Sequence, residues 1–168
     1  MLFPSREGKA ESVSSAVIPE EAPFVGLVTG ERVNCRAGPG LSFEVMIQLS
    51  KGEHLFVWKR KGSWYSVQLP VETPVYVSRG LVTILPQEKV AVVKGSSLHV
   101  RAGPGISYTS LGRLPRDTVV MVRQVLNEWV EIQPPDFCRG WIHRAYVTFL
   151  RERRGDLSNG STGAVSTD

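Results

Sequence analysis

The sequence predicts an all-β protein made of two small tandem barrels. The first observation is a repeat, because Arg36-Ala37-Gly38-Pro39-Gly40 returns 65 residues later as Arg101-Ala102-Gly103-Pro104-Gly105. The second is that turn residues recur about every 8 to 12 residues, while no segment has a helical period. The third is that the segments between turns are short and rich in branched and aromatic residues, which favour strands. A compact β unit that occurs twice explains all three observations.

Each copy of the repeated pentapeptide is expected to form a tight turn. Proline holds φ at about −65° and the glycine after it accepts positive φ, so Pro39-Gly40 and Pro104-Gly105 suit the centre of a type II turn. The ring also pushes the glycine before it toward extended backbone. Neither copy is therefore expected in a helix.

The expected strands of the first unit alternate with turns, most of which contain glycine. They are residues 24–29, 33–36, 45–49, 55–58, 64–69, 75–78 and 81–83. The second unit repeats this order without a gap, at residues 92–93, 98–101, 118–123, 129–133, 139–143 and 146–148. In the segment 129–133, the alternation of apolar and polar residues places Val130 and Ile132 on one face.

The repeat divides the 168 residues into two barrels joined by a short linker. The expected parts are a disordered lead at 1–23, a first barrel at 24–84, a linker at 85–90, a second barrel at 91–149 and a disordered basic and Ser/Gly-rich tail at 150–168. Because the linker is short and stiff at Pro86, we expect the barrels to sit side by side at a fixed angle. Units of about 60 residues bury only about 60% of their unfolded surface, so contact between them should stabilise both.

Three separated elements of the second unit resemble the bacterial SH3-like (SH3 type 3) domain. They are Leu98-His99-Val100-Arg101-Ala102-Gly103-Pro104-Gly105, a strand that begins at Trp129, and Gly140-Trp141-Ile142-His143-Arg144-Ala145-Tyr146-Val147. The resemblance covers about residues 24–149, although Val75, Tyr76 and Leu81 of the first unit stand where the closing pattern has Gly, Trp and Tyr. It implies two SH3-like barrels, each of five to seven strands, which bind peptidoglycan peptides or proteins in the cell envelope and are not catalytic by themselves.

A ligand groove on such a barrel would be lined by exposed aromatic side chains, with a few polar groups to orient an extended peptide. We expect four aromatic residues of the second unit, Tyr108, Trp129, Trp141 and Tyr146, to form it. Phe43, the repeat partner of Tyr108, is a further candidate. The alternative for each residue is packing in the core or a hairpin, because barrels of this size need aromatic side chains inside.

Trp58 differs from these residues because its repeat partner is Arg123, a residue type rarely buried without a partner. We therefore expect Trp58 to face outward, in the seam between the barrels or against a partner, and include it among the candidate binding residues.

The arginines of the repeats have two interpretations. Arg36 and Arg101 could bind a ligand carboxylate, but we expect them to bond to loop carbonyls and hold the Gly-Pro-Gly turn. Arg144 and its repeat partner Arg79 are better candidates for contact with a ligand at the surface.

Catalysis and metal binding have little support. Cys35 is expected to be a buried, inert thiol, and spacing alone does not tell whether it meets Cys138. With His54, His99 or His143 these thiols could in principle form a nucleophile and a base, but two barrels leave no room for a separate catalytic domain. The spacings typical of zinc or calcium ligands are absent from the sequence. We expect no enzyme, metal or cofactor.

Charge and hydropathy limit the partners and the location. The net charge of +4 favours anionic partners mildly, but acidic residues are interleaved with the bases, so we do not expect a nucleic-acid partner. No run of about 18 apolar residues is present, so no membrane span is expected. After Leu2 and Phe3 the chain turns polar, without the core of a secretory signal. Either the protein stays inside the cell or its export signal has been removed.

These observations together predict a non-enzymatic module of the cell envelope, in the periplasm or outside the cell, that recognises peptidoglycan or wall peptides through aromatic grooves. The partner would be a cell-wall peptide or an envelope protein. The alternative is a protein–protein interaction scaffold that acts by edge-strand addition or through hydrophobic patches around Trp58. The visible N-terminus would also fit a cytoplasmic protein.

Overall fold

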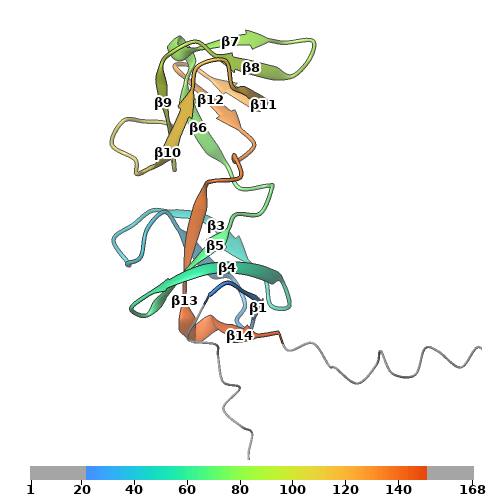
Figure 1. Cartoon of the computed structure of the whole chain (residues 1–168), viewed down its shortest axis with the longest axis vertical. Coiled ribbons are helices and arrows are strands. Elements are labelled where there is room, and N and C mark those ends of the chain that lie inside the picture. The colour runs from blue at the N-terminus through green and yellow to red at the C-terminus, as the bar shows by residue number, and fades with distance from the viewer. Residues whose placement is uncertain (1–21, 151–168) are drawn as a thin grey trace, which may run out of the picture.

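The computed structural model describes residues 22–150 as strands joined by turns, with two short 3-10 helices (Figure 1). This confirms the expected all-β class. The disordered lead and tail expected from the sequence lie, at residues 1–21 and 151–168, outside the described residues. Within the described part, no helix is long and apolar enough to cross a membrane.

The strands form two antiparallel sheets of seven strands each. The first contains β1 (Phe24–Val28), β2 (Val33–Arg36), β3 (Val45–Leu49), β4 (His54–Lys61), β5 (Trp64–Gln68), β13 (Arg139–His143) and β14 (Val147–Phe149). The second contains β6 (Val75–Ser78), β7 (Val82–Leu85), β8 (Val90–Val93), β9 (Ser97–Arg101), β10 (Ser110–Pro115), β11 (Val119–Leu126) and β12 (Trp129–Ile132). The 3-10 helices are η1 (Arg79–Leu81) and η2 (Arg144–Tyr146).

One sheet is formed by a continuous part of the chain and the other is not. The chain leaves the first sheet after β5 and returns to it at β13, so we call this sheet, residues 24–69 and 139–149, the interrupted unit. The second sheet, residues 75–132, is the inserted unit and lies at the top of Figure 1. The strand orders are β14-β1-β4-β5-β13-β2-β3 and, read in the same sense, β7-β8-β11-β12-β6-β9-β10. Each strand therefore stands where its repeat partner stands in the other unit.

The strands that close each unit come from the other repeat. In the interrupted unit β5 pairs with β13, with Trp64 opposite His143, and in the inserted unit β12 pairs with β6, with Trp129 opposite Ser78. The barrel boundaries expected at 24–84 and 91–149 follow the sequence repeat. The strands instead pair across these boundaries, so each sheet contains strands of both repeats. The register is nevertheless the same in both units, because β6 and β13 replace one another residue for residue.

The segment expected to be a linker is a hairpin turn of the inserted unit. Leu85 of β7 pairs with Val90 of β8, and the turn between them is closed by hydrogen bonds from Glu88 N to Leu85 O at 3.2 Å and from Lys89 N to Pro86 O at 3.3 Å. Residues 86–89 therefore join two neighbouring strands of one sheet.

The two connections between the units are repeat partners and have the same turn. Thr73 N donates to Pro70 O at 3.0 Å in the outgoing segment, and Cys138 N donates to Pro135 O at 2.9 Å in the returning segment. Thr73 and Cys138 are both fully buried. The chain thus crosses between the units twice through the same local structure.

A polar contact between repeat partners also joins the units. The carboxylate of Glu44 accepts hydrogen bonds from Thr109 N at 2.8 Å and from Thr109 Oγ1 at 2.7 Å. Burial alone would raise the pKa of the Glu44 carboxyl, but the bonds from Thr109 and from its own backbone lower it below its usual value. The contact therefore favours the ionised carboxylate.

The cores follow the alternation read from the sequence. Val130 and Ile132 of β12 are fully buried, as expected, and so is Cys35 of β2. In the interrupted unit Phe24 meets Tyr65 edge to face, with ring centroids 5.5 Å apart, a favourable arrangement for aromatic pairs.

The Gly-Pro-Gly turns are not the type II turns expected from the sequence. Neither Gly40 nor Gly105 has a positive φ. Instead, Gly40 N donates to Gly38 O and Gly105 N donates to Gly103 O, each at 2.9 Å. A hydrogen bond between residues i and i+2 defines a γ-turn centred on the proline, whose fixed φ suits the inverse form.

Gly140 is the position where β13 comes closest to the core of the interrupted unit. A Cβ at Gly140 would lie 2.3 Å from Cys35 Sγ and 2.6 Å from Leu69 Cδ2. Both neighbours are buried, so neither can move aside without disturbing the packing. Glycine is therefore required there by space, since the position has no positive φ.

We predict that Gly140→Ala lowers the free energy of unfolding by about 1 to 3 kcal/mol, the usual effect of overpacking a core. The measurement is urea denaturation followed by tryptophan fluorescence. Gly80→Ala is the control, because a Cβ at Gly80 meets only Ser78 Oγ, at 4.0 Å, and its repeat partner is Ala145. Equal stability of the two variants would contradict the close packing at Gly140.

Candidate functional site

The four aromatic residues expected to form one groove lie in two different units. Tyr108 and Trp129 belong to the inserted unit, whereas Trp141 in β13 and Tyr146 in η2 belong to the interrupted unit. The structure therefore brings together Trp141 and Tyr146 with strands of the first repeat, and separates them from Trp129.

Phe43 and Tyr108 pack onto the loops that carry them. A Cβ at Gly38 would lie 2.3 Å from the ring of Phe43, and a Cβ at Gly103 would lie 2.3 Å from the ring of Tyr108. The ring covers the glycine that precedes the proline, which explains why glycine occupies that place in both repeats.

Arg36 and Arg101 hold these same loops, as expected from the sequence. Arg36 Nη1 donates to Phe43 O at 3.0 Å and to Leu41 O at 3.2 Å. Arg101 Nη1 donates to Tyr108 O at 3.0 Å. The guanidinium groups thus replace missing backbone partners in the loop.

Trp58 faces outward, as expected, with 42% of its surface exposed. The guanidinium of Arg139 lies over its ring at 4.3 Å, and its Nε1 donates to Gln68 Oε1 at 3.3 Å. Arg139 Nη1 donates to the same oxygen at 3.1 Å. Trp58 therefore packs where the returning chain enters β13, at the junction of the two units.

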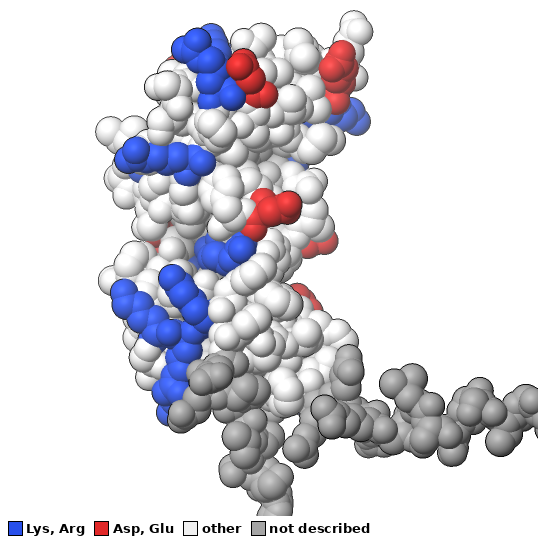
Figure 2. Space-filling view, viewed as in Figure 1, with Lys and Arg blue, Asp and Glu red and all other residues white. Residues whose placement is uncertain are grey.

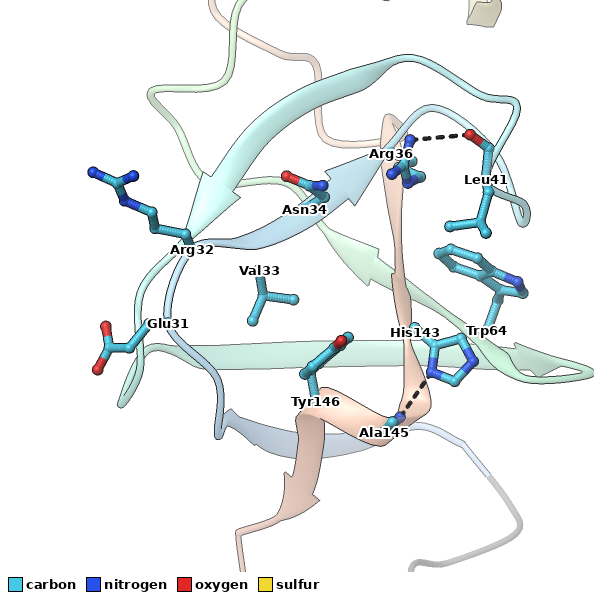
Figure 3. Close-up of a pocket in the computed structure, with 10 residues that line it drawn as sticks. All are labelled: Glu31, Arg32, Val33, Asn34, Arg36, Leu41, Trp64, His143, Ala145 and Tyr146. Atoms are coloured by element: carbon cyan, nitrogen blue, oxygen red, sulfur yellow. Dashed lines mark hydrogen bonds between the residues drawn. The ribbon is translucent and has the colours of Figure 1, made fainter.

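A pocket of about 340 Å³ lies on the interrupted unit (Figure 3). It is lined by Glu31, Arg32, Val33, Asn34, Arg36, Leu41, Trp64, His143, Ala145 and Tyr146. The first repeat supplies Trp64 at the start of β5 and the residues around β2, and the second supplies the end of β13 and η2. In Figure 3, Trp64, Leu41 and His143 gather at one end, while Glu31 and Arg32 extend outward at the other.

Three aromatic rings form a ladder across this pocket. Trp64 and His143 meet edge to face with centroids 5.4 Å apart, and His143 and Tyr146 do so at 6.2 Å. His143 Nδ1 accepts a hydrogen bond from Ala145 N at 3.1 Å, so the neutral imidazole carries its hydrogen on Nε2. Tyr146 is held by its carbonyl, which accepts from Thr29 N at 3.0 Å. With 48% of its surface exposed, Tyr146 is available to a ligand.

The charges around the pocket favour a ligand with an anionic group. Arg32 and Arg36 line it together with a single carboxylate, Glu31. Figure 2 shows Lys and Arg side chains gathered along one flank of the interrupted unit, whereas the inserted unit presents both signs of charge in the same view. A neutral or cationic ligand would gain less from this distribution.

Trp64 and His143 are pocket residues that the sequence analysis did not select. Trp64 is the repeat partner of Trp129, and His143 lies in the same closing pattern as Trp141 and Tyr146. The repeat pattern therefore contains both residues. However, we expected each repeat to form its own barrel, which placed Trp64 and His143 in different barrels. Arg144 is exposed beside this pocket in η2.

The two cysteines considered as nucleophiles lie in the core. Cys35 and Cys138 are both free and buried. Burial raises the pKa of each thiol to about 12, although a backbone hydrogen bond from Trp141 acts against it at Cys35 and the charge of Arg139 does so at Cys138. In the described part, no group of three or more metal-ligating side chains occurs.

One serine lies beside a histidine. His99 Nδ1 and Ser110 Oγ are 2.7 Å apart, as a cross-strand contact between β9 and β10. Burial and the charges of Arg113 and Arg101 lower the pKa of His99. The nearby charges are cationic, whereas an activated Ser-His pair needs an acid to orient and stabilise the imidazolium. This contact is a structural one.

Comparison with known proteins identifies part of the chain. Residues 96–148 match the family model of the bacterial SH3 domain. This match spans strands of both units, from β9 in the inserted unit to β14 in the interrupted one. No solved structure gave a significant match.

A curated relative is the "Putative N-acetylmuramoyl-L-alanine amidase YrvJ" of Bacillus subtilis (strain 168). The two sequences are 30% identical over 131 residues, which are 73% of this chain and 25% of the relative. The chain therefore spans about a quarter of the length of the relative that it matches.

The two thiols are predicted to be unreactive in the folded protein. At pH 8 a thiol with a pKa near 12 carries almost no thiolate, so labelling by a water-soluble thiol reagent should be at least about 100-fold slower than in denaturant. The measurement is the rate of labelling followed by mass spectrometry. Fast reaction of Cys138 in the folded state would contradict the burial of the returning segment.

Proposed function

We propose that this chain is a non-catalytic module that binds peptidoglycan or its peptides in the cell envelope. The observation that carries the proposal is the pocket of the interrupted unit, where the ring ladder of Trp64, His143 and Tyr146 lies beside the cationic Arg32 and Arg36. Concave sites with aromatic walls and a few polar groups are typical of ligand-binding surfaces.

The comparisons support a wall ligand. Residues 96–148 match a bacterial SH3 domain, and the relative in Bacillus subtilis carries a name that refers to cleavage at N-acetylmuramoyl-L-alanine. A module that recognises the substrate polymer of such an enzyme fits both findings. The proposed location is therefore the cell envelope, and the proposed partner is a wall peptide.

The chemistry of the pocket suits a peptide with free carboxylates. The faces and edges of Trp64 and Tyr146 offer apolar contact to short side chains, and His143 Nε2 is left to donate a hydrogen bond because Nδ1 is engaged. Arg32 at the rim can reach an anionic group, since guanidinium binds carboxylates well. Arg36 is occupied by loop carbonyls, so it contributes charge rather than a direct contact.

The proposal includes the absence of catalytic activity in this chain. Both thiols are buried with raised pKa values, and neither contributes to the pocket lining. A nucleophile has to be exposed to its substrate and activated. We therefore propose that any wall cleavage connected with this chain is carried out elsewhere.

The proposal predicts that the protein sediments with purified, insoluble peptidoglycan and that Tyr146→Ala weakens this binding about tenfold or more, as expected for an aromatic contact at the centre of a site. Tyr108→Ala is the matched control, because Tyr108 is also an exposed tyrosine but lies outside the pocket. Circular dichroism checks that both variants fold.

Two outcomes would reject the proposal. Absence of sedimentation at low salt would favour the protein–protein scaffold, for which the exposed pair Phe56 and Trp58, with ring centroids 4.6 Å apart, is the candidate surface. New muropeptide products after incubation with the protein, detected by mass spectrometry, would show that the chain is an enzyme.

A further inference from the structure

We infer that residues of both repeats build the binding pocket, that it occurs once in the described part of the chain, and that the sequence itself selects the strand exchange that forms it. The use of the pocket as a ligand site rests on the proposed function, whereas the exchange and the way it is selected do not.

The pocket needs residues from both repeats. Trp64 and the residues around β2 come from the first repeat, whereas His143 and Tyr146 come from the second. If each repeat closed on itself in the same register, Trp64 would lie opposite Ser78 of its own repeat, as Trp129 does in the inserted unit. The ladder of three rings therefore exists only because β13 and η2 replace β6 and η1.

The inserted unit lacks the ring ladder for the complementary reason. Its tryptophan, Trp129, has Ser78 in the place of His143 and Leu81 in the place of Tyr146. The residues that correspond to Glu31 and Arg32 are Ser96 and Ser97. This unit thus offers one aromatic ring where the interrupted unit offers three, and it keeps Arg101 in the place of Arg36 but lacks the charges of Glu31 and Arg32.

Side-chain size at one position favours the exchanged pairing. In the interrupted unit Gly140 is required, because a Cβ there would lie 2.3 Å from Cys35 Sγ. The repeat partner of Gly140 is Val75, which is fully buried in the inserted unit. Pairing of the first repeat with itself would push the whole Val75 side chain against Cys35, while pairing of the second with itself would leave a cavity at Gly140. Both faults cost stability, and the exchange avoids both.

The hairpin at residues 86–89 favours the exchange as well. Its hydrogen bonds from Glu88 N and Lys89 N hold β7 directly against β8. If each repeat closed on itself, β7 would have to pair with β1 in one unit and β8 with β14 in the other. This tight turn closes a short loop at low entropic cost, which offsets part of the cost of pairing β5 with β13 across the inserted unit.

The exchange can be tested without any ligand by NMR on the isotope-labelled full chain. Cross-strand contacts between the backbones of Trp141 and Ser66 are expected, since these residues are opposite one another in β13 and β5. Self-closed repeats would instead bring Trp141 opposite Glu131, the repeat partner of Ser66. Contacts between Trp141 and Glu131 would overturn the inference. Sedimentation equilibrium should give a monomer, which would show that the exchange takes place within one chain.

The single site is tested by two matched alanine variants and sedimentation with insoluble peptidoglycan. Trp64→Ala should weaken binding about tenfold or more, whereas Trp129→Ala, its repeat partner, should leave binding within about twofold. Self-closed repeats predict the reverse, because Trp129 would then lie beside His143 and Tyr146. Equal losses would also contradict a single site. If the unaltered protein fails to sediment, the proposed function fails, and the NMR contacts alone decide whether both repeats build the pocket.

Discussion

The pairing of β5 with β13 is the interaction on which the rest of this structure depends. It completes the sheet of the interrupted unit, places Gly140 against Cys35 and brings His143 opposite Trp64. It also obliges β6 to pair with β12, because each of these strands has lost the neighbour from its own repeat. The division of the chain into an interrupted and an inserted unit, and the ring ladder on the interrupted unit, follow from this one choice of partner.

Much of the fold could be predicted from the sequence. The alternation in β12 placed Val130 and Ile132 in the core, and the repeat predicted the order of the strands along the chain, apart from β10, which was not among the expected strands. The loop role of Arg36 and the outward position of Trp58 were also predicted correctly. These features depend on local patterns, and local patterns are what a sequence displays most directly.

The choice of partner strand could not be predicted in the same way. Since β6 and β13 have the same register toward their partners, every argument from hydrophobic pattern or turn spacing applies equally to both. The two strands differ in how they pack, because the space beside Cys35 admits Gly140 but not Val75. Such packing can be judged only when the neighbouring side chains in the structure are known. The same limit hid the pocket: Tyr108 was expected to line a groove with Tyr146, but its ring packs on Gly103 in the inserted unit, away from the pocket.

As a result of the exchange, the two units differ in the length of chain that their strand pairings must close. All seven strands of the inserted unit lie in one continuous segment, residues 75–132, so even its longest pairing, between β6 and β12, closes a loop within that segment. The interrupted unit instead has to bring β13 back to β5 over the whole length of the inserted unit. Once that unit is folded, its two connections, each with the same proline turn, hold the ends of this long loop together and reduce the entropy that closure would otherwise cost. The inserted unit thus stabilises a pocket to which it contributes no residue.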